Sequence, residues 1–413
     1  MVKDLDVFLK SGHQRLFVGR LSYSIADNRS LFEYDGSFLG SGFSISPIQL
    51  PLDTGVFRAD RPKYPDDPLY GLHGVFADSL PDTWGRKVQD LWFQKIGIVN
   101  PHPFDRLAYV GDFAMGALSY EPALKIKNSR KNITELSGLR KAAIGIQKGN
   151  IESVTGHLNR MGGSAGGMHP KFLVGFNPHT KMCTYGTVLE DSEVPAIVKV
   201  PVDSSEETQK TEYLYSSMAR LAHIDIPTTY LIECKKLAYY LIERFDIQDD
   251  GTRNHVHTMA GMMGINYADR TIDYRQAFRL THGLTRDIRQ LEQLYRRMVF
   301  NLLSGNQDDH AKNMSYIMDC KGTWRLAPAY DLTFSRTTHG THSMSINGSV
   351  AHHSLKDLEV LAGEFGIKTW QEILDSVRES LQQWPRLASS VDISSKTKDL
   401  VFKSILDIDG QVF

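Results

Sequence analysis

The spacing of apolar residues predicts an extended first part and a helical last part of the chain. Residues 15–60 combine short apolar runs such as LFVGRLSYSI with Gly, Ser and Phe, a pattern typical of short strands joined by turns. Residues 74–97 predict a turn followed by a helix whose start is marked by Pro81 and Asp82. In 285–305 apolar residues recur every three or four positions, so they form one stripe of a helix that stops at Gly305. Residues 370–384 have the same amphipathic pattern.

Between these parts, several predicted strands surround one predicted helix. KFLVGF at 171–176 and PAIVKVPV at 195–202 are apolar runs of strand length. The segment 228–246 has the pattern of two strands joined at 234–236, and helical spacing occurs at 210–223. We therefore expect a mixed α and β protein whose last part is mostly helical.

Composition narrows the class of protein. A chain of 413 residues with 41% hydrophobic and 23% charged residues is typical of a globular protein with two or three domains. The net charge of −1 gives no global electrostatic reason to expect nucleic-acid binding. The three cysteines are isolated, the N-terminus is too polar for a signal peptide, and no apolar run has the roughly 18 residues of a membrane helix. We expect a cytoplasmic protein with no membrane association.

A polar loop, NQDDHAKN, follows the long predicted helix. In kinase-like sites an Asp orients the substrate hydroxyl and an Asn five residues later binds Mg²⁺, as Asp308 and Asn313 could do here. Asp331, in PAYDLT, is a second hard oxygen ligand of the kind Mg²⁺ prefers. The spacing alone also fits a solvated loop, in which His310 and Lys312 would be surface residues or braces.

Three upstream patterns favour the kinase interpretation through their order along the chain. The glycine-rich RMGGSAGGMHPK at 160–171 allows backbone N–H groups to approach phosphates, although it also fits a flexible loop. Lys199, on an apolar strand, and Glu212, near the start of the next helix, match the phosphate-binding pair of kinases, with an edge-strand Lys and a solvated Glu as the alternative. LIERFD at 241–246 ends a strand where a two-lobed kinase has its hinge.

In SAGGMHPK, IVKVP, LIERFD, DDHAKN and PAYDLT, the chain resembles the HipA family of bacterial serine/threonine kinases, the toxin halves of HipBA-type modules. GVFADSLPDTWGR and GDFAMGALSYEP are similar to that family's N-terminal subdomain. The resemblance implies an α+β, two-lobed protein-kinase-like fold with a β-rich N-terminal subdomain and a mostly helical C-terminal lobe. The implied domains are an N-terminal subdomain (1–125), a kinase N-lobe with the glycine-rich loop and hinge (126–247) and a helical C-lobe with the catalytic loop (248–413).

The resemblance also implies roles for single residues. Asp308 would be the catalytic Asp, and Asn313 and Asp331 would hold Mg²⁺. Ser164 would be autophosphorylated, and its added negative charge would repel the ATP phosphates and switch the kinase off. The residues expected to line the ATP site are Ser164, Gly166, Gly167, Met168, His169, Pro170, Lys171, Lys199, Glu212, Glu243, Phe245, His310, Lys312, Asn313, Tyr330 and Asp331.

We therefore predict an ATP- and Mg²⁺-dependent serine/threonine protein kinase of the HipA toxin type. Its substrate would be a cellular protein, for which an aminoacyl-tRNA synthetase is one candidate. Its partner would be a HipB-like helix-turn-helix antitoxin, so DNA would be contacted only indirectly. A small-molecule or lipid kinase, and a kinase-like corepressor acting with the antitoxin, are the alternatives.

Some residues fall outside these predicted roles. The glycine-rich segment has more Gly than the family's pattern, and it has a Pro where the best-known members have a Gln-Glu pair before the Lys. Asp309 stands where Gly is common. The substrate therefore cannot be copied from a known member. We expect Asp309 to be the least informative residue of the loop. A metal site built from four downstream histidines is disfavoured because they lack the H-E-x-x-H spacing; they are His339, His342, His352 and His353.

Overall fold

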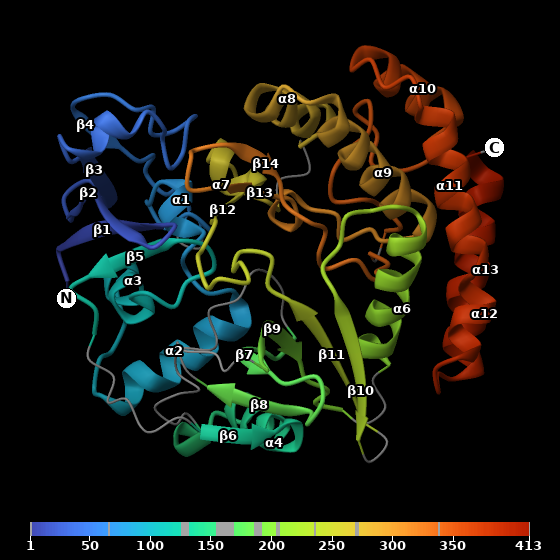
Figure 1. Ribbon diagram of the computed structural model, residues 1–413, viewed down its shortest axis with the longest axis horizontal. Coiled ribbons are helices and arrows are strands. Elements are labelled where there is room, and N and C mark those ends of the chain that lie inside the picture. Colours follow the sequence, from blue (N-terminus) through green and yellow to red (C-terminus); the bar gives the residue numbers. More distant parts are fainter. Residues whose placement is uncertain are drawn as a thin grey trace. The chain divides into compact units, whose positions relative to one another are not determined.

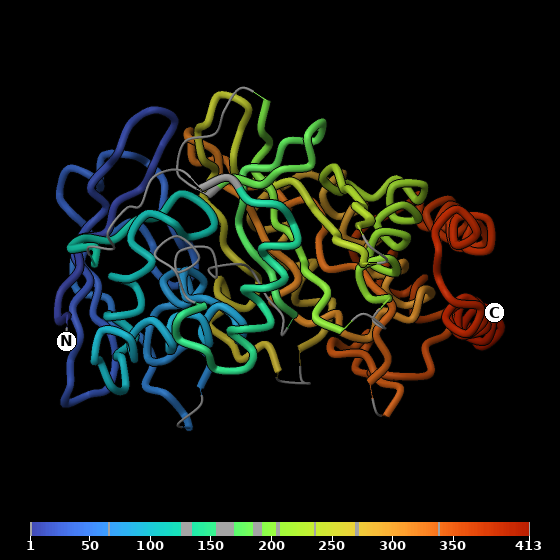
Figure 2. The backbone as a smooth tube through the Cα atoms, turned by 90° about the horizontal axis from the view of Figure 1, so that it is seen from below, coloured from blue at the N-terminus to red at the C-terminus, as the bar shows by residue number. Residues whose placement is uncertain are grey.

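The chain forms two compact units, each assembled from three separate stretches of sequence. The computed structural model describes residues 2–64, 67–124, 132–153, 169–185, 192–203, 207–234, 237–268, 272–337 and 339–412. The first unit comprises Met1–Ser204, Leu241–Asn266 and Ile317–Thr323. The second comprises Ser205–Tyr240, Tyr267–Tyr316 and Trp324–Phe413. The interleaving of these stretches can be followed by colour in Figures 1 and 2.

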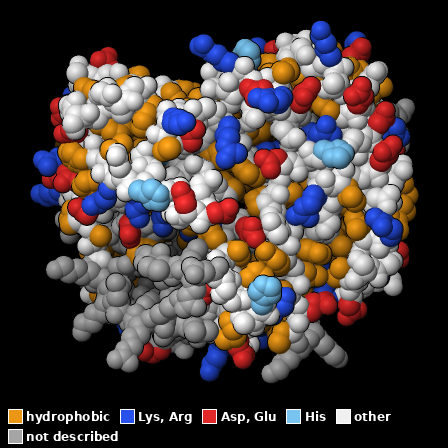
Figure 3. Space-filling model, in the orientation of Figure 1, with side chains coloured by type: hydrophobic (Ala, Val, Ile, Leu, Met, Phe, Trp, Pro, Cys, Tyr) orange, Lys and Arg blue, Asp and Glu red, His pale blue; other side chains and the backbone are white. Residues whose placement is uncertain are grey.

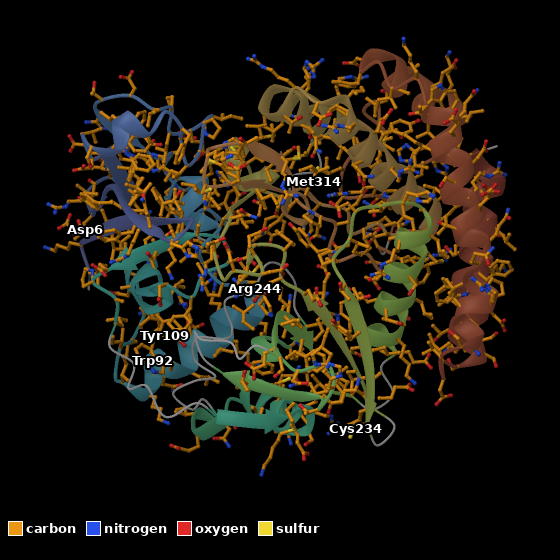
Figure 4. The ribbon with its side chains drawn as sticks, viewed as in Figure 1. Asp6, Trp92, Tyr109, Cys234, Arg244 and Met314 are labelled. Atoms are coloured by element: carbon orange, nitrogen blue, oxygen red, sulfur yellow. The ribbon has the colours of Figure 1, made fainter. Side chains whose placement is uncertain are left out.

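An antiparallel sheet opens the first unit. Its strands, in the spatial order β4-β3-β2-β1-β5, are β4 (Val56–Arg58), β3 (Arg29–Tyr34), β2 (Gln14–Ser24), β1 (Asp4–Ser11) and β5 (Leu118–Glu121). Buried and less buried residues alternate along β1, so Leu5, Val7 and Leu9 are buried on one face. Asp6, labelled in Figure 4, lies between them in sequence and accepts a hydrogen bond from Arg20.

Helices of the first unit lie between β3 and β5 in the chain. They are η1 (Phe38–Ser41), α1 (Gly74–Ala77), α2 (Thr83–Lys95) and α3 (Pro103–Val110). The rings of Trp92 and Tyr109, both labelled in Figure 4, pack edge to face at 4.7 Å and join α2 to α3. Asp82 begins α2 by accepting a hydrogen bond from the Gly85 N–H, which is the start that the sequence predicts.

A second sheet of the first unit carries the chain on both sides of the glycine-rich segment. Its strands in that unit follow the order β9-β7-β8-β6, with bounds β9 (Val194–Lys199), β7 (Lys171–Phe176), β8 (Met182–Tyr185) and β6 (Asn132–Glu135). The other elements of this unit are α4 (Leu136–Gln147), η2 (Ile151–Ser153), β12 (His255–Thr258) and α7 (Met259–Met263). Lys171 on β7 is the register partner of Lys199 on β9.

The second unit is mostly helical. Its elements are α6 (Thr208–Leu221), β10 (Thr229–Cys234), α8 (Tyr274–Thr285), α9 (Ile288–Ser304), η3 (Ala311–Asn313), β14 (Trp324–Leu326), α10 (Leu355–Glu364), α11 (Trp370–Gln382), α12 (Trp384–Ser389) and α13 (Ser395–Val412). Two further strands, β11 (Leu237–Glu243) and β13 (Ser315–Met318), run across the unit boundary. The apolar stripe of α9 is buried because α8, α11 and α13 pack against this helix.

The predicted α+β fold, with a β-rich first part and a helical last part, is confirmed. The predicted helix at 285–305 begins at Ile288, because Arg286 has a left-handed φ of +49° and Asp287 caps the new helix. Its predicted stop is correct: Gly305 takes a φ of +71°. In the parts of the chain that the structure describes, no helix is long and apolar enough to cross a membrane. On the face drawn in Figure 3, acidic and basic side chains are interspersed.

Candidate active site

The loop after α9 is held firmly at its base. Asn306 donates a hydrogen bond from its side chain to the Asn301 Oδ1 (2.9 Å) and another from its backbone N–H to the Asn301 carbonyl. The Gln307 N–H donates to the carbonyl of Ser335 (2.9 Å). Buried Met314, labelled in Figure 4, ends the loop just before β13. The DDHAKN segment, residues 308–313, therefore begins directly after two residues whose backbone is fixed, Asn306 and Gln307.

Two neighbouring acids of this loop have opposite environments. The Asp308 side chain is 58% exposed, and its Oδ1 lies 3.9 Å from the Nε2 of His310. The Asp309 side chain is only 1% exposed. Its carboxylate accepts three hydrogen bonds, from Tyr274 Oη (2.9 Å), His342 Nδ1 (3.0 Å) and the Ser343 N–H (2.9 Å). The expectation that Asp309 is the least informative residue was wrong, because this side chain anchors the loop.

Asn313 and Asp331 have features of cation ligands. The Asn313 Nδ2 donates to the Asp308 carbonyl (2.9 Å), while its buried Oδ1 has no hydrogen-bond donor among the described residues. Asp331 has a φ of +57°, a left-handed conformation that costs a non-glycine residue about 1–3 kcal/mol and is often found at functional sites. Tyr330, just before it, donates from its hydroxyl to the Lys312 carbonyl (2.9 Å). The Asp331 segment is thereby fixed to the end of the loop.

These donors fit Mg²⁺, which takes hard oxygen ligands and keeps several waters and phosphate oxygens in its shell. One amide oxygen without a hydrogen bond and one carboxylate are enough protein ligands for such an ion. Among the residues whose placement is described, no three His, Cys, Asp or Glu side chains form a metal-binding group. His342 is instead bonded to Asp309, and its ring packs at 5.7 Å against His353.

Tyr267 organises the two basic residues of the loop. Its ring lies 5.0 Å from that of His310, and the Lys312 Nζ is 5.5 Å from its ring centroid, a cation–π distance. The buried Nδ1 of His310 has no hydrogen-bond partner in the described part of the chain. Sequence reasoning missed Tyr267, since a single aromatic residue outside any periodic pattern gives no signal.

In the first unit, Lys171 is held from two sides by the start of α2. The Lys171 and Asp82 side chains are 2% and 3% exposed, and Lys171 Nζ lies 3.0 Å from Asp82 Oδ2. The Trp84 Nε1–H donates to the Lys171 carbonyl (3.0 Å). The end of the glycine-rich segment is therefore fixed, and the Lys171 ammonium is neutralised by Asp82, which the sequence predicts only as a helix start. The predicted contact of Lys171 with ATP stays a prediction.

The predicted hinge is also fixed to the N-terminal part of the first unit. Arg244, labelled in Figure 4, donates to Asp246 from Nε (3.0 Å) and Nη2 (2.6 Å), and the Gly116 N–H donates to the same carboxylate (2.7 Å). Burial favours a raised pKa for Asp246, but the Arg244 guanidinium and these hydrogen bonds hold that pKa below its usual range. LIERFD and GDFAMGALSYEP, two motifs far apart in sequence, thus contact each other.

A Ser–His–Asp arrangement in the first unit is closed to substrates. His257 Nδ1 lies 2.6 Å from Asp78 Oδ2, and its Nε2 lies 3.0 Å from Ser46 Oγ. Ser46 and His257 are fully buried, so no substrate reaches the hydroxyl. The cluster instead ties β12 to the chain around α1.

The predicted site residues are divided between the units. The second unit contains Asp308, His310, Lys312, Asn313, Tyr330 and Asp331. It also contains Glu212, which is buried on α6. His169, Pro170, Lys171, Lys199, Glu243 and Phe245 belong to the first unit. Ser164, Gly166, Gly167 and Met168 lie outside the described residues. Lys199 and Glu212, the predicted phosphate-binding pair, thus come from different units.

A solved structure with the same fold covers nearly the whole chain. In the complex of HipA, HipB and operator DNA from the Shewanella oneidensis MR-1 toxin–antitoxin system, the matched chain aligns over 98% of this chain and 96% of its own, with a TM-score of 0.71 and 16% identity. That similarity defines the fold: this chain shares the α+β fold of the matched HipA chain. Family models also match: HipA N-terminal domain over residues 5–121 and HipA-like C-terminal domain over residues 163–384. The chain belongs to the HipA family, as predicted.

A curated relative is described as a kinase. "Putative kinase Y4dM" of Sinorhizobium fredii (strain NBRC 101917 / NGR234) is 25% identical over 229 residues, which is 50% of this chain. The match spans 55% of that relative, about half of its length.

Proposed function

We propose that this protein is an ATP- and Mg²⁺-dependent serine/threonine protein kinase of the HipA toxin type, acting in the cytoplasm. Family membership supports the proposal, and one observation carries it: exposed Asp308 precedes Asn313, whose buried Oδ1 has no donor among the described residues. In this proposal residues 1–125 form the N-terminal subdomain, 126–247 the nucleotide-binding lobe and 248–413 the catalytic lobe.

The proposed chemistry depends on positioning and charge. A Ser or Thr hydroxyl of the protein substrate attacks the γ-phosphorus of ATP, the bond to the ADP oxygen breaks, and Asp308 orients the hydroxyl and accepts its proton. Asn313 and Asp331 would hold Mg²⁺, which neutralises phosphate charge when bound. Lys199 binds phosphate oxygens, Glu212 pairs with that lysine, and the backbone of Glu243 and Phe245 binds adenine. Together with the glycine-rich segment, six further residues line the nucleotide: His169, Pro170, Lys171, His310, Lys312 and Tyr330.

Autophosphorylation of Ser164 would switch the kinase off. A phosphate adds about −1.5 to −2 charge, which repels the phosphates of ATP. The test is incubation with ATP–Mg²⁺ followed by intact-mass analysis and peptide mapping. We expect one added phosphate, located on Ser164, in the wild-type protein. A Ser164→Asp protein that binds ATP as tightly as wild type would contradict the switch.

The catalytic assignment is tested by substitution. We expect Asp308→Asn and Asp331→Asn to abolish phosphate transfer while the thermal unfolding curve is unchanged, because neither change alters side-chain size. Asp375→Asn, at an exposed position on α11, is the control and should transfer phosphate as wild type does. Normal transfer by Asp308→Asn would refute the mechanism, and a wild-type protein inactive toward itself and all proteins of a cell extract would refute the protein kinase.

The proposed partners follow from family membership. We propose a HipB-like helix-turn-helix antitoxin, with DNA contacted through it, and a protein substrate for which an aminoacyl-tRNA synthetase is one candidate. Comparison of phosphoproteomes with and without the active protein identifies the substrate. Phosphate found only on small molecules or lipids would favour a small-molecule or lipid kinase over a protein kinase. Size-exclusion chromatography after co-expression with a helix-turn-helix protein from the same operon tests the antitoxin.

A further inference from the structure

We propose that Asp309 is a positioning residue for the kinase reaction: its buried carboxylate locks the DDHAKN segment so that Asp308 is presented to the substrate. This inference rests on the proposed kinase function.

The donors to Asp309 come from separate parts of the second unit. Tyr274 is the first residue of α8, whereas His342 and Ser343 belong to the segment that follows Asp331. The hydroxyl of Tyr274 in turn accepts a hydrogen bond from Asn301 Nδ2 (3.2 Å) on α9. One carboxylate therefore joins the loop to two helices and to the chain after Asp331.

A second contact strengthens the same junction. The hydroxyl of Ser343 donates to the Gln307 carbonyl (3.0 Å), and its N–H lies within hydrogen-bond distance of both Gln307 O and Asp309 Oδ1. Hydrogen bonds to an ionised acceptor are roughly twice as strong as neutral ones. Removing the carboxylate would leave buried donors unpaired, so the loop would rearrange to satisfy them.

Backbone geometry transmits this lock to Asp308. Residues 307–310 belong to no helix, and burial alternates along them: Gln307 and Asp309 are buried, whereas Asp308 is exposed. His310, the next residue, has extended φ and ψ angles of −73° and 160°, and in extended chain consecutive side chains point to opposite sides. Holding Asp309 inward consequently holds Asp308 outward, and displacement of a reacting group by about 1 Å can cost on the order of 100-fold in rate.

The experiment separates positioning from general stability. Asp309→Ala removes the acceptor, and Tyr274→Phe removes one donor while keeping the ring. Tyr295→Phe is the matched control, because Tyr295 is fully buried and its hydroxyl donates to the Leu358 carbonyl (3.1 Å), away from the loop. For each full-length protein we would measure the maximal rate of γ-phosphate transfer, the Kd of a fluorescent ATP analogue with Mg²⁺, and amide hydrogen exchange in residues 306–313.

We expect Asp309→Ala and Tyr274→Phe to lower the maximal rate by about tenfold or more and to speed exchange in the loop, with the nucleotide Kd within about twofold of wild type. Tyr295→Phe should lose a similar amount of thermal stability but keep the rate. Asp309→Asn, which keeps one acceptor oxygen, should have a maximal rate and a loop exchange rate between those of wild type and Asp309→Ala.

Equal slowing by Tyr274→Phe and Tyr295→Phe, or unchanged rate and exchange in both Asp309 variants, would overturn the proposal. If Asp309→Ala fails to fold, the comparison of the two Tyr variants decides. A wild-type protein that transfers no phosphate refutes the kinase itself; unchanged loop exchange in the variants refutes the lock separately.

Discussion

The buried pair of Asp82 and Lys171 allows a quantitative test of how the N-terminal part holds the glycine-rich segment. Asp82→Ala leaves the Lys171 ammonium buried and unpaired, which costs about 3–5 kcal/mol. The same substitution removes the hydrogen bond that begins α2, at a further cost of about 1 kcal/mol. We therefore expect about 4–6 kcal/mol, or a fall of roughly 10–20 °C in Tm for a unit of this size.

A double-mutant cycle isolates the pair from the helix cap. Lys171→Met keeps the length of the side chain and should cost about 3 kcal/mol, because the Asp82 carboxylate keeps the Gly85 N–H but loses its cation. With both changes no buried charge is left unpaired, so the double variant should be several kcal/mol more stable than the sum of the single costs predicts. The readout is the urea and thermal unfolding of the full-length protein, followed by circular dichroism.

A control on the same helix has a known expectation. Asp90 lies on α2, is half-exposed and pairs with Arg106 of α3. Asp90→Ala should therefore cost no more than about 1 kcal/mol. Strictly additive costs in the Asp82 and Lys171 cycle, or a cost for Asp82→Ala as small as that for Asp90→Ala, would refute the reasoning.

Three further predictions concern other positions. A Cβ on Gly74 would lie 1.9 Å from a backbone oxygen of α7, so Gly74→Ala should lower Tm strongly, whereas Gly36→Ala, which meets nothing within 4 Å, should not. Arg244→Met removes the hydrogen-bonded guanidinium from the buried Asp246 carboxylate, which keeps only the charge of Arg253 nearby, and should cost about 3–5 kcal/mol in urea unfolding. Burial, together with the nearby His342, lowers the pKa of His353 from 6.5 to about 4. The unfolded chain therefore binds the proton at a higher pH than the folded chain does. Wild type should consequently lose stability as the pH falls from 6.5 towards 4. His353→Phe should flatten that part of the Tm–pH curve; an unchanged slope would contradict the assignment.

Local signals in the sequence predicted the elements well, whereas contacts between distant segments were not predictable. Gly305 and the stripe of α9 were correct because caps and periodicity act within a few residues. Asp309 looked like a second solvated acid, since its donors lie more than thirty residues away in both directions. The pairing of Lys171 with Asp82 likewise joins positions 89 residues apart without any repeating pattern.

The interleaved course of the chain has a consequence for synthesis on the ribosome. Asp78 and Gly116 appear early, yet their partners His257 and Asp246 lie in Leu241–Asn266, and the first unit also needs Ile317–Thr323. At about 5–20 residues per second, these partners follow on the order of ten seconds later. The N-terminal part of the first unit therefore cannot complete these buried hydrogen bonds until the later segments have been synthesised.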